Sequence, residues 1–180
     1  PDAALYWFAR MLTGGEDPRY LARRITRMAV EDIGLAEPAA QRHCLDAWAL
    51  YERLGSPEGE LALAQAVVFL ALAPKSNAVY AGYKNAMAAA AKTGSESPPD
   101  HILNAPTDLM KDQGYGQGYQ YDHDTADGIA YDQTGFPDAM GEQIYYQPVP
   151  QGLEKQIGER LSFIRDKRVQ ALKAKRGTNA

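Results

Sequence analysis

The sequence predicts a mainly α-helical fold: a helical bundle or array first, then an irregular Gly/Tyr-rich segment with short strands, then a C-terminal helix. Apolar residues recur at i, i+3, i+4 and i+7 in five segments of the first half, which is the period of a helix with one buried face. Links of about three to five residues join these segments, so consecutive helices should be antiparallel neighbours. We therefore expect a helical domain at residues 1–93 and a loop-rich subdomain at 94–180.

The first three helices each start at an acidic residue or proline and end at a glycine. Asp2 precedes the first helix, and Gly34 ends the second. Arg23, Arg24 and Arg27 lie opposite the apolar face of the second helix. The expected ranges are 3–13, 18–33 and 38–54.

The fourth helix is the most apolar stretch of the chain. From Leu61 to Ala73 only Gln65 is not apolar, the triplet Ser56-Pro57-Glu58 provides the start signals, and Pro74 provides the stop. A helix that is apolar on every side is expected to be buried on every side. Its 13 residues fall short of the roughly 20 that cross a bilayer. This helix should therefore be the centre of the bundle.

A polar cluster opens the fifth helix, which is expected at about 76–92. The cluster consists of Lys75, Ser76 and Asn77, with Tyr80 and Lys84 one and two turns later. A helix N-terminus of this kind can receive an anion. The alternative is that these residues only cap the corner between two helices.

The second half begins with a change of composition at residues 94–100, which are rich in Gly, Ser and Pro. After this linker, the residue pattern predicts a short helix, two short strands and one long helix. The expected ranges are 106–111 for the short helix, 129–131 and 143–149 for the strands, and 152–173 for the long helix.

Charge is segregated in the second half. Residues 94–152 hold ten acids and one base, whereas residues 153–176 hold eight bases and three acids. The basic helix either forms an electrostatic partner surface or packs onto the acidic region of its own or a neighbouring chain. The net charge of −4 and pI near 5.4 argue against a protein that coats nucleic acid through bulk charge.

No motif for catalysis or nucleotide binding occurs in the sequence. A Walker A loop, a nucleophile elbow, a zincin motif and paired cysteines are all missing. We therefore expect no enzyme activity and no cofactor in this chain. There is also no signal peptide pattern and no span long enough for a membrane, so no membrane partner is expected.

Three further features have competing interpretations. Asp122-His123-Asp124 could bind a divalent metal, but neighbouring residues rarely converge on one ion, so a solvated acidic turn is favoured. Cys44, the single cysteine, excludes an internal disulfide, fits a reducing compartment and is interpreted as a small core residue. The tyrosines of the Gly/Tyr tract, Tyr115, Tyr119 and Tyr121, could stack on nucleobases. Such stacking sites usually include basic residues, whereas acidic residues follow this tract, so packing of the loop onto the helical core is favoured.

Several motifs together resemble a known family. They are PDAALYW at 1–7, EDIGL at 31–35, YERLGSPEG at 51–59, APKSNAVY at 73–80, NAPT at 104–107 and GYG at 114–116. With them, the chain resembles the C-terminal region of the replication-associated recombination protein A family, the RarA/MgsA type of AAA+ ATPase. That family is related to clamp loaders and to the Werner-helicase-interacting protein. The resemblance covers essentially the whole chain.

The resemblance implies that nucleotide-binding and lid domains, with ATP and Mg, lie upstream of Pro1, and that this chain is a fragment. The helical half would correspond to the collar-like oligomerisation region of clamp loaders, in a family of homotetramers. The parent would be a DNA-dependent ATPase acting in replication, recombination and repair at stalled forks. DNA and single-stranded-DNA-binding protein would be its partners, and it would be cytoplasmic and nucleoid-associated.

Two functions follow as hypotheses. The first is a non-catalytic oligomerisation or interaction domain, and the alternative is a direct DNA-binding module that uses the basic C-terminal helix. Gln117, Gln120 and Asp122 stand where family members often carry bases and a proline, which weakens the case for DNA contact by the Gly/Tyr tract. The candidate surface for a partner or DNA comprises Lys75, Ser76, Asn77, Tyr80, Lys84, Lys111, Tyr115 and Tyr119.

Overall fold

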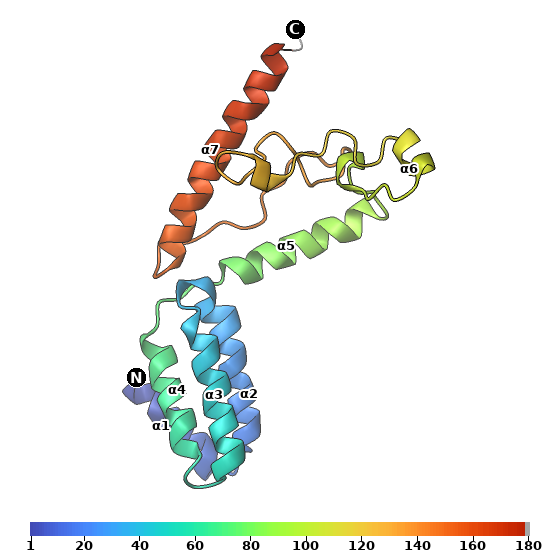
Figure 1. The fold of residues 1–180 in the computed structure, drawn as a ribbon. Coiled ribbons are helices and arrows are strands. Elements are labelled where there is room, and N and C mark those ends of the chain that lie inside the picture. The colour runs from blue at the N-terminus through green and yellow to red at the C-terminus, as the bar shows by residue number, and fades with distance from the viewer. Residues whose placement is uncertain (179–180) are drawn as a thin grey trace. The chain divides into compact units, whose positions relative to one another are not determined.

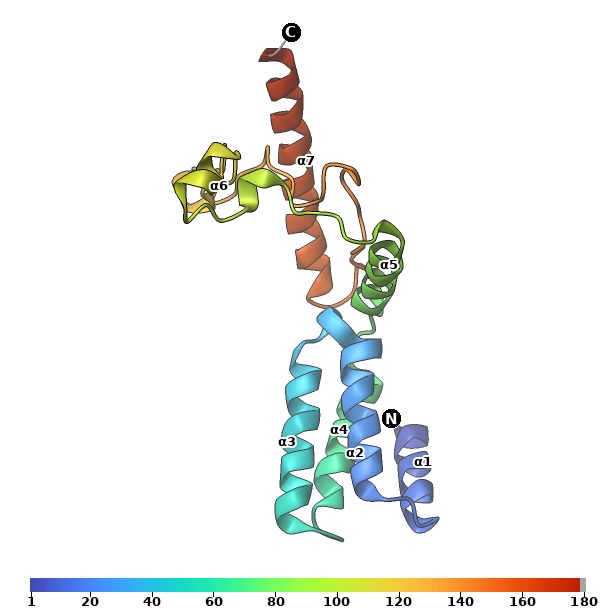
Figure 2. The ribbon, with the colours of Figure 1, turned by 90° about the vertical axis from the view of Figure 1, so that its right-hand side faces the viewer.

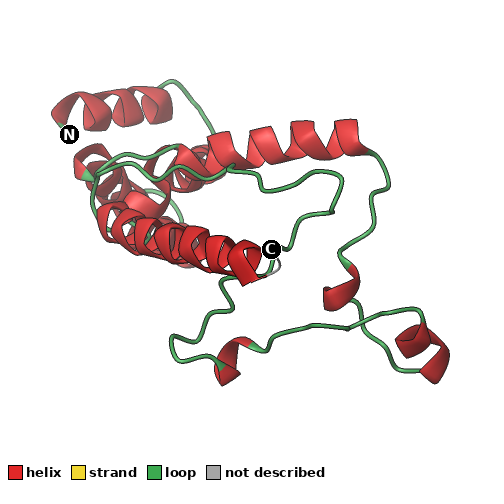
Figure 3. Ribbon diagram, turned by 90° about the horizontal axis from the view of Figure 1, so that it is seen from above, coloured by secondary structure: helices red, strands yellow, loops and turns green. Residues whose placement is uncertain are grey.

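The structure is a computed structural model that describes residues 1–178, with side chains through residue 175. Its described part consists of helices and loops (Figure 3). The α-helices are α1 (Asp2–Thr13), α2 (Pro18–Met28), α3 (Ala39–Leu54), α4 (Glu60–Leu72), α5 (Ala78–Thr93), α6 (Asp108–Asp112) and α7 (Glu154–Thr178). A π-helix at Ala29–Ile33 and 3-10 turns at Gly34–Ala36, Asp100–Ile102 and Asp122–Asp124 complete the helical elements of the described chain. The mainly α-helical prediction is confirmed.

The two predicted strands are wrong, because no β-strand occurs in the described residues. Residues 129–131 follow a tight turn in which the Thr125 hydroxyl accepts the Ile129 N–H at 2.7 Å. Residues 143–149 have no regular secondary structure and find no second strand to pair with. Pro148, which lacks an N–H, further reduces the capacity of this segment for strand pairing.

The described chain divides into two compact units. The first comprises Pro1–Lys84 with Tyr146–Gly158, and the second comprises Asn85–Tyr145 with the chain from Glu159 onward. The division at residue 93 that the composition predicts stays a prediction.

The core of the first unit is built around α4. Helices α1, α2 and α3 pack against it, and Figures 1 and 2 show α2, α3 and α4 side by side. The side chain of Leu63 is fully buried, and so is Cys44, which donates its thiol hydrogen to the carbonyl oxygen of Ile25. Burial raises the pKa of the Cys44 thiol to about 11, so it is an unreactive core residue, as the sequence predicts.

The prediction that α4 is buried on every side is wrong. Leu63, Val67 and Leu70 face the other helices, whereas the side chains of Leu61 and Leu72 are 74% and 67% exposed. Helices α1, α2 and α3 are the main neighbours of α4 within the first unit, and they leave Leu61 and Leu72 exposed. The start of the helix also differs, because α4 begins at Glu60 with Gly59 in the N-cap position.

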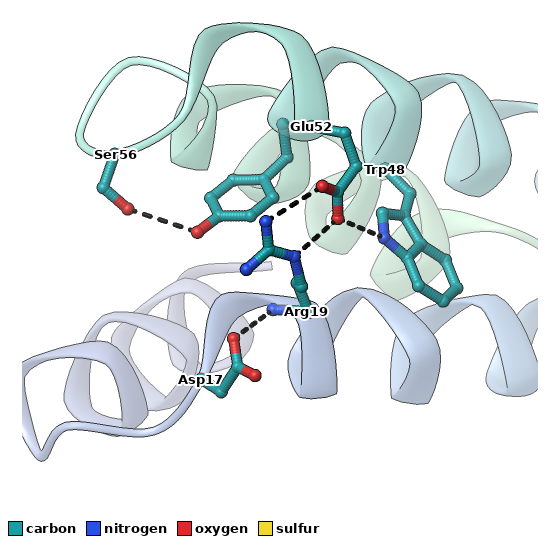
Figure 4. Close-up of polar contacts among 6 residues, drawn as sticks. Asp17, Arg19, Trp48, Glu52 and Ser56 are labelled. Carbon is teal, nitrogen blue, oxygen red and sulfur yellow. Dashed lines mark hydrogen bonds and ion pairs between the residues drawn. The ribbon is translucent and has the colours of Figure 1, made fainter.

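A polar network joins α2 to α3 at the surface of the first unit (Figure 4). The Arg19 guanidinium donates two hydrogen bonds to the Glu52 carboxylate, at 2.9 and 3.1 Å, and Trp48 Nε1 donates a third at 3.2 Å. Asp17 accepts the Arg19 N–H at 2.9 Å and caps α2, as its position before Pro18 predicts. The hydrogen bond from Arg19 is the main cause that lowers the pKa of Glu52.

The second unit confirms that the basic helix packs onto the acidic region of its own chain. Arg168 of α7 contacts the Glu142 carboxylate at 2.7 Å and the Gln133 carbonyl oxygen, and Lys175 contacts Asp132 at 3.2 Å. The last predicted base, Arg176, lies outside the described side chains. Two cations of α7 are therefore neutralised within the chain.

The Asp122-His123-Asp124 segment is a 3-10 turn in the second unit, and Asp122 accepts the Ala130 N–H at 2.7 Å. No cluster of metal-binding side chains occurs in the described chain. Packing of the loop tyrosines onto a core does not hold for Tyr119 and Tyr121, which are 55% and 53% exposed.

Leu63→Ala should lower the free energy of unfolding by about 2–5 kcal/mol, because it leaves a cavity in the core. The matched control on the same helix is Leu61→Ala, which should change it by no more than about 0.5 kcal/mol in dilute solution. Urea denaturation below micromolar protein concentration measures both. Equal losses would contradict the one-sided burial of α4.

The lowered pKa of Glu52 predicts a stabilising contribution from its charged form. That contribution is present above the pKa of Glu52 in the unfolded chain, and it is lost as pH falls through the lower folded value. NMR titration of the side-chain carboxyl should show the Glu52 pKa rise in Arg19→Gln. The Glu52 pKa should stay unchanged in the control variant Arg42→Gln, which removes the separate Arg42–Asp46 ion pair.

Candidate functional site

The corner between α4 and α5 holds three of the residues that the sequence singles out. The Lys75 ammonium donates to the carbonyl oxygens of Leu70 at 2.9 Å, Ala71 at 3.4 Å and Ala73. It thereby caps the C-terminus of α4, where carbonyl groups lack helical partners. The buried Ser76 hydroxyl accepts the Ala78 N–H at 3.2 Å and caps α5. Lys75 and Ser76 are therefore committed to capping, whereas Asn77 is exposed.

Backbone hydrogen bonds lock this corner against two other segments of the first unit. The Ser76 N–H donates to the Asp32 carbonyl oxygen at 2.9 Å, and the Leu153 N–H donates to the Ala36 carbonyl oxygen at 2.9 Å. We call this contact of residues 32–36, 74–76 and 152–153 the junction. At Gly152, whose φ is +50°, a Cβ atom would lie 2.0 Å from the Ala36 oxygen, so only glycine fits.

A buried carboxyl group adjoins the junction at the start of α7. The side chain of Glu154 is fully buried, and its Oε1 accepts the Tyr146 hydroxyl at 2.7 Å. Burial first, and the hydrogen bond to Glu154 second, raise the pKa of the Tyr146 phenol. The carboxyl group lies in the first turn of a helix, where the helix dipole favours negative charge. It anchors the beginning of α7.

An open hollow of about 670 Å³ lies beside the junction. It is lined by Met28, Asp32, Lys75, Ser76, Asn77, Val149, Pro150 and Gln151. The sequence leaves two interpretations of this corner open, an anion site and a simple cap. In the structure the Lys75 ammonium is bound to three carbonyl oxygens, and Asp32 is among the residues that line the hollow. These contacts support capping as the role of Lys75, and an anion site at this corner stays a prediction.

The other candidate residues divide between the two units. In the first unit, Tyr80 and Lys84 are exposed on α5. In the second unit, Lys111 contacts Asp108 at 3.1 Å, Tyr115 is half-buried and Tyr119 is exposed. A role for these residues in binding stays a prediction.

A charged surface on α2 is a feature that the sequence-based site prediction missed. α2 carries Arg19, Arg23, Arg24 and Arg27 and no acidic residue. The signal was available, because four bases without an acid in eleven residues is unusual in a chain of net negative charge. The exposed apolar side of α4 was also missed, since an all-apolar sequence does not show how many neighbours a helix has.

Comparison with known proteins gives a consistent result. Residues 1–165 match the family model described as "MgsA AAA+ ATPase C terminal". The chain is 52% identical over 165 residues to the replication-associated recombination protein A of Coxiella burnetii, covering 92% of this chain and 38% of that protein. It is 49% identical over 164 residues to the protein of the same name from Escherichia coli K12, covering 91% and 37%.

A eukaryotic protein is also similar. The ATPase WRNIP1 of Dictyostelium discoideum is 38% identical over 146 residues, covering 81% of this chain and 17% of that protein. The chain thus spans less than two-fifths of the length of the curated relatives it matches.

Gly152→Ala should destabilise the first unit through a clash with Ala36 as well as through its positive φ. Gly55→Ala is the matched control, because Gly55 also has a positive φ but no atom within 4 Å of its Cβ position. The control should lose roughly 1–3 kcal/mol of unfolding free energy, because Gly55 lies in a backbone region that is nearly exclusive to glycine, and Gly152→Ala should lose more.

Hydrogen exchange should show that the Leu153 amide loses protection in Gly152→Ala and keeps it in Gly55→Ala. Equal protection in the two variants would mean that the junction does not depend on the close approach at Gly152.

Proposed function

Because the chain belongs to the family of C-terminal domains of MgsA-type AAA+ ATPases, we propose that it is the assembly domain of a replication- and recombination-associated ATPase. The chain itself carries out no catalysis in this proposal. ATP hydrolysis would belong to the remainder of the parent protein, and the relatives' names associate the parent with replication and recombination.

The observation that carries the proposal is the uncovered side of α4. Leu61, Gln65, Val68 and Leu72 follow one another at i, i+4, i+7 and i+11, which places them on one stripe of the helix. Leu61 and Leu72 are strongly exposed, and Val68 is half-buried. A stripe with this spacing is the seam along which two helices pack.

A second copy of the chain is the occupant that we propose for this stripe. Full burial of one leucine side chain is worth about 1.5–3 kcal/mol. A symmetric contact would bury Leu61 and Leu72 of both copies, four leucines in all, and would therefore provide a substantial driving force. Leu54 at the end of α3, in the same unit, is also exposed. The resemblance to clamp-loader collars agrees with self-association as the role of these helices.

The alternative function, DNA binding by the basic helix α7, has less support. Arg168 and Lys175 contact carboxylates of their own chain, so the charge that suggested this function is partly neutralised.

No helix in the part of the chain that the structure describes has the length and apolarity to cross a bilayer.

Sedimentation velocity at tens of micromolar should show an oligomer of the chain, and Leu72→Lys should shift it toward monomer, because the substitution places a charge in the seam. Leu109→Lys is the matched control, since both leucines are 67% exposed and Leu109 lies on α6 of the second unit.

Monomer alone for the unmodified chain would contradict the proposal. Equal dissociation by both lysine variants would place the contact elsewhere than on α4.

A further inference from the structure

A small apolar pocket lies in the first unit where α1, α2, the π-helix and α4 meet. Its volume is about 140 Å³, and its apolar lining comes mainly from Ala4, Ile25, Ile33, Val67, Leu70 and Ala71. An apolar cavity of roughly 150 Å³ is large enough to hold a benzene ring. The apolar pocket therefore has room for one large apolar side chain, such as that of leucine or phenylalanine.

Two alanines and the π-helix create this space. Ala4 of α1 and Ala71 of α4 each bring only a methyl group to the pocket, so the volume that a longer side chain would occupy is left open. The π-helix at Ala29–Ile33 is a rare element that frequently occurs at functional sites. It contributes both an apolar wall, Ile33, and a charged residue, Asp32, to the pocket.

The apolar pocket adjoins the hollow of about 670 Å³ beside the junction, because Met28, Asp32 and Lys75 line both. Met28 is 44% exposed, and the flexible thioether side chain of methionine adapts to ligands of different shape. In the hollow, the exposed residues Asn77 and Gln151 add side-chain amides that can bond to a peptide backbone. Pocket and hollow together offer an anchor point for one side chain, with space beside it for the neighbouring residues of a peptide.

Asp32 supplies a negative charge where the pocket and the hollow meet. Its backbone carbonyl oxygen accepts the Ser76 N–H at 2.9 Å, which fixes the residue at the junction. Its side chain has no hydrogen-bond or ion-pair partner among the described residues. The nearby cations are already used, because Lys75 binds three carbonyl oxygens and Arg27 pairs with Glu31 at 2.6 Å. The exposed Asp32 carboxylate therefore favours a cationic group on a ligand.

We propose that the apolar pocket and Asp32 form a docking site for a peptide segment of a partner protein, in which a leucine or phenylalanine stands next to an arginine or lysine. The apolar side chain enters the pocket against Val67 and Leu70, and the neighbouring cation pairs with the Asp32 carboxylate. The site uses other residues of α4 than the seam of Leu61 and Leu72, so the proposal does not depend on self-association.

The two halves of the recognition should respond differently to the ligand and to salt. Replacing the apolar anchor by glycine should weaken binding at least tenfold, because the burial of a leucine side chain is lost. Replacing the cation by a neutral residue should weaken it roughly twofold to fivefold, as is typical of an exposed ion pair. Added salt should reduce the second effect and leave the first, since salt screens charges.

The experiment is a methyl NMR titration of the full 180-residue chain with synthetic peptides of about eight residues. The peptides share one Gly/Ser frame and differ only at two central positions, which hold Leu-Arg, Leu-Gln, Leu-Glu or Gly-Arg. The Leu-Arg peptide should bind most tightly. It should shift the methyl signals of Ile33, Val67 and Leu70, whereas those of Leu61 in the seam should stay in place.

Three variants separate the charge from the pocket. Asp32→Asn should remove the preference for the Leu-Arg over the Leu-Gln peptide. The matched control is Asp46→Asn on α3, which removes the same charge from another exposed residue and should leave the preference unchanged. Ala71→Leu fills the apolar pocket and should weaken the binding of every leucine peptide at least tenfold. The Asp32→Asn result decides the proposal even if Ala71→Leu disturbs the fold, because the Asp32 side chain is exposed.

Four results would overturn the proposal. The first is the absence of methyl shifts at the pocket with the Leu-Arg peptide. The second is tighter binding of the Leu-Glu peptide, which would identify a site for acidic segments. The third is a preference for arginine that Asp32→Asn leaves intact, and the fourth is full binding by a folded Ala71→Leu variant.

Discussion

The close approach of three backbone segments at the junction is the constraint on which the rest of the first unit depends. Gly34 and Gly152 both have positive φ values, and at both positions a Cβ atom would collide with a carbonyl oxygen of another segment. The contact fixes where α5 and α7 begin relative to α4. Lys75 and Ser76 cap the helices that meet there, so both side chains have a structural role at this corner.

The bundle next to the junction is left incomplete on one side. Three helices cover Leu63, Val67 and Leu70 of α4, but the stripe from Leu61 to Leu72 faces away from them. Exposed leucines in single positions are common on protein surfaces. It is less common for exposed leucines to lie along one stripe of a helix that is apolar at almost every position. A second chain that covers this stripe would explain why α4 is so apolar.

The sequence predicted the helices well because periodicity, caps and prolines act locally. It failed where the answer depends on distant neighbours. Residues 143–149 have no partner strand in the part of the chain that the structure describes, and the residue pattern of that segment cannot show this. The number of helices around α4 and the use of the Lys75 ammonium are also set by packing. The arginines of α2 were visible, but only the structure shows that Arg23 and Arg24 have no acidic partner among the described residues, whereas Arg168 and Lys175 have one each.

The central claim is that the uncovered stripe of α4 is the surface by which chains of this family pair. Isotope-filtered NMR of a mixture of labelled and unlabelled chains tests it directly, because such spectra detect only contacts between different molecules. Cross-peaks from the methyl groups of Leu61 and Leu72 to a second chain are the expected result. An oligomer whose intermolecular cross-peaks arise only from other surfaces would contradict the account.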